Sequence, residues 1–164
     1  MTTKFTTGEI AGTYVATGTL TEQDILEMAN TISKRKFYRG RKFTSAQDAM
    51  SYLQCLMQDE THEIFGMICL DTQHRVIGRF NLFHGTINEA AVYPREVVKR
   101  ALFEHAGAVI LFHNHPSGLS SPSQADIRLT RDLKSALETV EIQVLDHIVV
   151  GRDDVTSLAQ QGLM

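Results

Sequence analysis

Two histidines and an aspartate, His113, His115 and Asp126, have the clearest chemical potential in this sequence. The histidines follow the apolar run 109–112, which predicts a buried strand ended by a loop that contains proline and glycine. Residues two apart on a strand project from the same face, so both imidazoles can reach one point. Two neutral imidazoles and one carboxylate leave a fourth tetrahedral position for water. The pattern therefore predicts a catalytic Zn²⁺ site.

Each fragment of this pattern also has a purely structural interpretation. Ser123 and Asp126 have the spacing of a capping box at the start of a helix. His113 and His115 can be hydrogen-bonded residues at the end of a strand, in a metal-free α/β domain. Asp146-His147 can support the metal from outside its ligand shell, or form a hydrogen-bonded pair in the core. The occurrence of all these short motifs in one chain favours the interpretation as a metal site.

Helices and strands alternate along the chain. The first 20 residues are polar and predict a tail with at most one strand, and residues after 150 predict another polar tail. The hydrophobic spacing and the start and stop signals predict helices from 21 into the basic stretch 33–42, from 44 to 57, from 94 to a stop at Gly107 and from 123 to about 140, and strands over 63–70, 75–83, 109–115 and 142–150. This order predicts an α/β fold with a central mixed sheet.

Composition is that of an ordinary soluble domain of 164 residues with a net charge of −3. Overall charge does not imply nucleic acid, although the basic stretch 33–42 can contact an acidic partner or a nucleic-acid backbone. A solvated helix end is the simpler interpretation of that stretch. Two cysteines without close spacing predict neither a disulfide framework nor a thiolate zinc site. No apolar run predicts a membrane span or a secretion signal, so we expect a cytoplasmic protein.

Several motifs in order along the chain resemble the RadC family, a branch of the JAMM metalloprotease-like superfamily. They lie at 83–86, 93–99, 113–118, 122–126 and 144–151. The resemblance covers 43–164 and leaves 1–42 as an N-terminal tail and helix with the basic segment. It implies a JAMM-type fold, related to cytidine deaminases, with a mixed β-sheet flanked by helices. It also implies zinc held by His113, His115 and Asp126, with Ser123 hydrogen-bonded to the oxyanion of a scissile amide.

One position departs from the family pattern. In related hydrolases a glutamate on an upstream strand takes a proton from the attacking water and passes it to the leaving amine. The resemblance places that position at Phe80, which cannot accept a proton. Another acid can replace it, but the spacing selects none of the candidates, which are Glu63, Glu89, Glu96 and Glu104.

Two functions follow from the pattern and the resemblance. The first is a zinc-dependent hydrolase of amide or peptide bonds that acts on a peptide or protein. The second is a catalytically weak or inactive zinc-binding module that acts in protein or DNA binding. Longer RadC-like proteins carry an N-terminal helix-hairpin-helix region of a kind associated with DNA. Residues 1–42 are too few for a complete one, so the sequence supports a DNA role only weakly.

Overall fold

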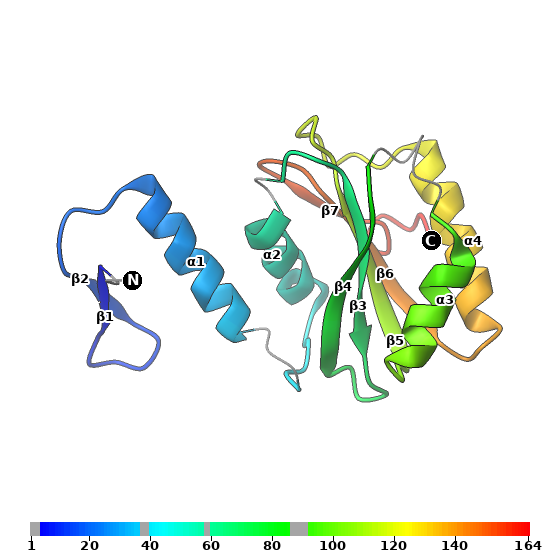
Figure 1. The fold of residues 1–164 in the computed structure, drawn as a ribbon, viewed down its shortest axis with the longest axis horizontal. Coiled ribbons are helices and arrows are strands. Elements are labelled where there is room, and N and C mark those ends of the chain that lie inside the picture. The colour runs from blue at the N-terminus through cyan, green and yellow to red at the C-terminus, as the bar shows by residue number, and fades with distance from the viewer. Residues whose placement is uncertain (1–3, 37–39, 58–59, 86–91) are drawn as a thin grey trace.

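A central mixed sheet with helices on both faces positions the predicted site residues. The structure is a computed structural model that describes residues 4–36, 40–57, 60–85 and 92–164. Five strands pair in the order β4-β3-β5-β6-β7 (Figure 1). Their bounds are β3 Ile64–Leu70, β4 Val76–His84, β5 Ala108–Asn114, β6 Gln143–Val150 and β7 Val155–Ser157. Only β5 and β6 pair in parallel, and the other neighbours in the sheet are antiparallel.

The helices form a layer on each face of this sheet. Helix α2 (Ala46–Met57) covers one face, and α3 (Pro94–Phe103) and α4 (Gln124–Glu138) cover the other (Figure 1). Helix α4 connects β5 to β6, as a crossover between parallel strands requires. The α/β class and the mixed sheet flanked by helices, which the sequence predicted, are confirmed.

The central strands β3 and β5 are buried along their whole length. Both of their faces therefore need apolar side chains, which explains why their sequences are continuous apolar runs and do not alternate with polar residues. Residues at even positions of β5, such as Ile110 and Phe112, pack in the core beneath α2. Residues at odd positions, such as Val109 and Leu111, pack in the core beneath α3 and α4. His113 continues the second series, so it faces α4.

The N-terminal segment lies beside α2 and away from the sheet (Figure 1). Strands β1 (Phe5–Thr7) and β2 (Tyr14–Ala16) form a two-stranded sheet, and α1 (Glu22–Lys36) follows. Helix α1 contacts α2, where the Cys55 thiol donates a hydrogen bond of 3.3 Å to the Asn30 side chain. The predicted start of α1 is confirmed, because Thr21 and Asp24 form a reciprocal cap.

Three details differ from the sequence prediction. The N-terminal tail contains two paired strands, and the C-terminal tail contains β7. Helix α3 ends at Phe103, before the predicted stop at Gly107. His105 adopts a left-handed conformation (φ 52°), and Ala106 N–H donates to the Ala101 carbonyl, which is the Schellman pattern of a helix end.

Candidate metal site

His113 and His115 lie at the carboxyl end of β5 and face each other. Their Nε2 atoms are 3.0 Å apart, so the predicted projection from one face is confirmed. The His113 side chain is fully buried, and its ring stacks on Phe65 at a centroid distance of 6.4 Å. The His115 side chain is 19% exposed. The pair therefore joins the buried core to the surface of the molecule.

The Asp126 carboxylate approaches both histidines from the first turn of α4. Its Oδ1 atom is 3.4 Å from His113 Nε2, and its Oδ2 atom is 3.8 Å from His115 Nε2. The Oδ2 atom also accepts a hydrogen bond of 2.6 Å from the Ser123 backbone N–H. The buried Oδ1 atom has no hydrogen-bond partner among the described residues. One oxygen therefore anchors the carboxylate while the other points at the histidine pair.

Ser123 is the N-cap of α4, and its side chain completes a capping box. The Ser123 hydroxyl oxygen accepts from the Asp126 N–H at 3.2 Å. The structural interpretation of these two residues is thus correct, and it supports the chemical one, because the cap fixes the carboxylate near the histidines. The hydroxyl only accepts in this bond, so its own proton is available to a ligand.

Glu63, directly before β3, is the acid that sequence reasoning did not select. It forms a candidate metal-binding group with His113 and His115, in which one donor atom of each residue lies within 4.8 Å of the others. Phe65 pairs with His113 in the antiparallel register, so a step of two residues along each strand places Glu63 opposite His115. The histidine pair is therefore approached by carboxylates from two different elements.

Asn114 fixes the backbone on both sides of Glu63. Its side chain points to the opposite face of β5 from the histidines, as alternation along a strand requires. The Asn114 Oδ1 atom accepts from the Ile64 N–H at 2.8 Å, and its Nδ2 group donates to the His62 carbonyl at 3.0 Å. The residue between the two histidines thus holds the strand that presents Glu63.

The sequence predicted that Phe80 leaves the site without an acid that accepts a proton. In the structure Phe80 lies away from the histidine pair, whereas Glu63 lies beside it. Phe80 lies on β4 and pairs with Met67 of β3, and the Arg100 guanidinium lies 5.1 Å from the centre of the Phe80 ring. A register shift between Phe65 and Gly66 accompanies a bulge in β4, at the edge of the sheet. Phenylalanine at position 80 does not leave the histidines without an acid, because Glu63 is already beside them.

Two of the other acids that the sequence left open, Glu96 and Glu104, are not in the site. Glu96 and Glu104 lie on and just after α3, where Glu96 is 3.4 Å from Arg95 and Glu104 is 3.2 Å from Arg100. Glu89 lies outside the described residues, as do residues 37–39 in the middle of the basic stretch. Contact of that stretch with nucleic acid stays a prediction.

Burial keeps the inner histidines uncharged at neutral pH. Burial lowers the pKa of His113 to about 4, although the nearby Asp126 carboxylate opposes the change. Burial also lowers the pKa of His147 well below its ordinary value, and proximity to His113 adds to this effect. His147 lies within hydrogen-bond distance of His113, with 2.8 Å between its Nε2 and the Nδ1 of His113. Neutral imidazole is the form that binds a metal.

The donors fit a divalent cation. His115 Nδ1 lies 2.8 Å from the Leu119 carbonyl, which can only accept, so Nδ1 carries the hydrogen of the neutral ring. The Nε2 lone pair of His115 then faces His113. An unpartnered, buried carboxylate oxygen of Asp126 lies at the same point. A cation would turn these mutually repelling donors into ligands.

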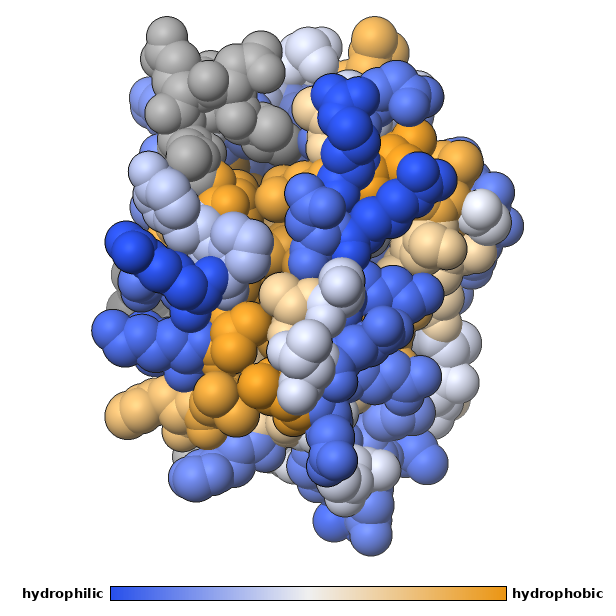
Figure 2. Space-filling model, turned by 90° about the vertical axis from the view of Figure 1, so that its right-hand side faces the viewer, coloured by the Kyte–Doolittle hydropathy of each residue, from blue (hydrophilic) through white to orange (hydrophobic). Residues whose placement is uncertain are grey.

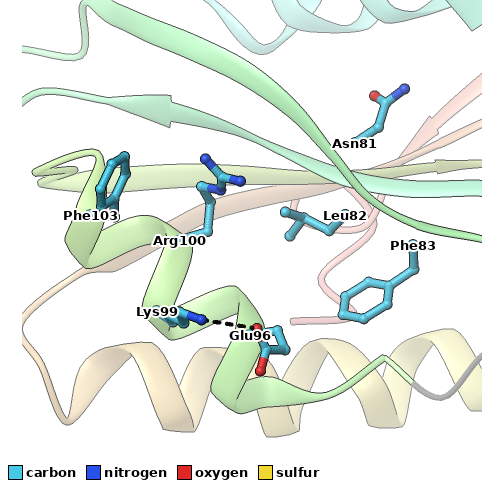
Figure 3. A pocket seen from close by; sticks show the side chains of 7 residues that line it. All are labelled: Asn81, Leu82, Phe83, Glu96, Lys99, Arg100 and Phe103. Carbon is cyan, nitrogen blue, oxygen red and sulfur yellow. Dashed lines mark ion pairs between the residues drawn. The ribbon is translucent and has the colours of Figure 1, made fainter.

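Two of the surface cavities differ in their relation to the site. One, of about 370 Å³, is lined by His115, Asn114 and residues of the loop after β6, including Arg152. The other, of about 420 Å³, lies between β4 and α3, where Leu82 and Phe83 face Glu96 and Arg100 (Figure 3). Hydrophobic and hydrophilic patches alternate on the face that carries α3 and α4 (Figure 2). Only the first of these two cavities has a metal-site histidine in its wall.

The fold and this site define the class of the protein. The chain belongs to the RadC-like JAB domain family, whose sequence profile matches residues 43–163. This result confirms the resemblance to the RadC family and agrees with a mixed sheet flanked by helices.

The relatives are UPF0758 proteins of bacteria, a name that specifies no reaction. The chain is 52% identical over 140 residues to one from Vibrio cholerae (strain M66-2), which covers 85% of this chain and 62% of the relative. It is 50% identical over 142 residues to one from Marinobacter nauticus, with 87% and 63% covered. It is 49% identical over 141 residues to another from Vibrio cholerae (strain N16961), with 86% and 89% covered. The chain thus spans less than two thirds of the first two relatives.

None of the described helices has both the length and the apolar composition that a membrane crossing needs.

Proposed function

We propose that this protein is a zinc-dependent hydrolase that cleaves amide bonds in a peptide or protein. The observation that carries the proposal is the convergence of two imidazole Nε2 atoms with the carboxylates of Asp126 and Glu63. A mixed set of imidazole and carboxylate ligands with an open position is typical of catalytic zinc. Family membership supports the same class of chemistry.

His113, His115 and Asp126 are the proposed ligands. Asp126 suits this role because its carboxylate is buried and is anchored through Oδ2 by the helix cap. Glu63 is less buried and lies at the start of a strand, where its longer side chain can move between partners. A bound Zn²⁺ polarises a carbonyl group and acidifies a water molecule, which are the two requirements of amide hydrolysis at neutral pH.

Glu63 is the proposed general acid and base. Its carboxylate accepts a proton from the attacking water and returns it to the nitrogen of the leaving amine. A positioned group of this kind typically accelerates a reaction by about a hundred- to ten-thousand-fold. The Ser123 hydroxyl, whose proton is not used in the cap, donates to the oxygen that becomes negative in the transition state. Of the residues in this proposal, His115 lines the surface cavity of about 370 Å³.

The metal assignment is tested by elemental analysis of purified protein and of His113→Ala and Asp126→Ala variants. We expect zinc in the unchanged chain, and a large loss of zinc in both variants. Glu96→Gln, on α3 and outside the site, is the matched control and should retain zinc. Equal zinc in all samples would remove the ligand assignment.

The catalytic assignment is tested with a library of fluorogenic peptide and isopeptide substrates. We expect Glu63→Gln to lose about a hundred- to ten-thousand-fold in kcat while zinc content stays unchanged, because an amide cannot accept the proton. Glu96→Gln should retain full activity. If Glu63→Gln loses zinc to the same extent as His113→Ala, then Glu63 is a ligand and the base assignment is wrong.

The second function, a zinc-binding module without hydrolysis, rested on the absence of an acid at Phe80. The position of Glu63 removes that reason. If the zinc-loaded chain cleaves no member of the library, that result would favour a role in protein or DNA binding.

A further inference from the structure

We propose that Thr130 and His147 are positioning residues of the metal site, which hold His113 in the tautomer whose Nε2 lone pair points at the metal. The inference rests on the proposed metal site and adds two residues that touch neither the metal nor the substrate. Thr130 lies on α4, and His147 lies on β6.

A continuous chain of short contacts connects the two residues to the ligands. The Thr130 hydroxyl lies 2.6 Å from the Asp126 carbonyl and 2.6 Å from His147 Nδ1. His147 Nε2 lies 2.8 Å from His113 Nδ1. Thr130, His147 and His113 are all 0% exposed. The chain begins at the backbone of one proposed ligand and ends at the side chain of another.

The direction of each hydrogen bond follows from the carbonyl group at the start of the chain. A carbonyl can only accept, so the single hydroxyl hydrogen of Thr130 is donated to Asp126. Thr130 must then accept from His147, whose Nδ1 therefore carries a hydrogen. The neutral ring of His147 has no hydrogen left for Nε2, so Nε2 accepts from His113 Nδ1. His113 thus keeps an unprotonated Nε2, which is the atom a metal requires.

His115 is held in the same tautomer by a separate hydrogen bond. The Leu119 carbonyl fixes the hydrogen of His115 on Nδ1, and the unprotonated Nε2 faces that of His113 at 3.0 Å. Two backbone carbonyls, one in the loop and one in α4, therefore determine the tautomers of the two proposed histidine ligands. Phe65 restrains the inner pair, since it stacks on His113 and meets the edge of His147 at 5.7 Å.

Replacement of Thr130 by valine breaks this chain with little change of shape. The variant leaves His147 Nδ1 without its acceptor, so the hydrogen of His147 moves to Nε2. His147 then donates to His113 Nδ1 and places the hydrogen of His113 on Nε2. A ring in that tautomer cannot bind a metal through Nε2, so the variant loses affinity before any ligand is removed.

The test is a competition for Zn²⁺ between the protein and a chromophoric chelator. We expect Thr130→Val to weaken zinc binding about ten- to a hundred-fold, the effect typical of groups that orient metal ligands. Thr130→Ser keeps the hydroxyl and should bind like the unchanged chain. Ile148→Val, which trims a buried side chain on the opposite face of β6, controls for general loosening and should also bind normally. Equal affinity of Thr130→Val and the unchanged chain, or an equal loss in Thr130→Ser, would overturn the proposal.

Nitrogen NMR of the unchanged, Zn²⁺-loaded protein provides a second measurement that does not depend on a variant. We expect His113 and His147 both to be protonated at Nδ1 and not at Nε2. A hydrogen on His147 Nε2 would overturn the inference. Failure of the metal site itself has a different signature, since His113→Ala would then bind Zn²⁺ as tightly as the unchanged chain.

Discussion

Acidification of the metal-free protein should destabilise its fold in the pH range in which histidines normally titrate. The reason is the burial of His113, whose pKa is lowered from 6.5 to about 4. At about 1.4 kcal/mol per pH unit for one proton, the difference between the two values corresponds to about 3 kcal/mol. This loss is a large fraction of the stability of an ordinary domain.

The direction of this change in stability follows from the number of protons that the folded and unfolded chains bind. As pH falls below 6.5, His113 becomes protonated in the unfolded chain, while it stays neutral in the folded chain until about pH 4. Unfolding therefore takes up a proton within this window, and acid favours unfolding. The contribution of His113 to stability is fully present above pH 6.5, falls through the window and levels off below about pH 4. His147, whose pKa is also lowered by burial, acts in the same direction.

The assay is urea denaturation followed by circular dichroism, in the presence of EDTA, at several pH values within this window. A His113→Gln variant removes one titrating group, so its stability should fall less steeply, by up to about 1.4 kcal/mol per pH unit. Burial raises the pKa of Asp146, which opposes the histidines. The comparison between the two chains cancels that contribution. Identical slopes in both chains would show that His113 is not buried in the neutral form.

Three further substitutions test the geometry around the site. Ser123→Ala removes the side chain of the α4 cap and should lower the free energy of unfolding by about 0.5–2 kcal/mol in urea titration, whereas Ser123→Thr should stay near the unchanged value. Phe80→Glu should change neither zinc content nor peptide hydrolysis, because Phe80 packs against Arg100 and away from the histidines; a gain of activity would mean that an acid is needed at position 80. Gly66→Ala should lower the free energy of unfolding by about 1–3 kcal/mol, because a Cβ there would press on the Phe80 backbone oxygen and lie 2.5 Å from the Phe112 ring. Unchanged thermal stability would mean that the central strands can separate.

The convergence of the cap and the metal site explains why short motifs were ambiguous in this chain. Ser123 and Asp126 form a capping box, and the same carboxylate faces His113 with its second oxygen. A carboxylate has two oxygens, so one can satisfy the helix while the other remains available for a cation. The two interpretations of the sequence were therefore not alternatives.

The spacing of residues close together in the sequence was sufficient to predict the helices and strands and part of the site. Alternation along β5 placed His113 and His115 on one face, and the start signals of α4 placed Asp126 in its first turn. These features depend on residues close together in the chain, whose geometry is set by strand and helix periodicity. The resemblance of several motifs in order supplied the family.

Only the tertiary structure identified Glu63, because its partners are fifty positions away. The antiparallel register of β3 with β5 brings Glu63 opposite His115, and register depends on the packing of both sheet faces. For His147, the sequence left open a supporting role at the metal or a place in the core, and the structure shows that it meets His113 because β5 and β6 pair in parallel across the α4 crossover. The sequence by itself therefore determined which residues could bind a metal. The pairing of the strands decided which acid and which second histidine accompany them.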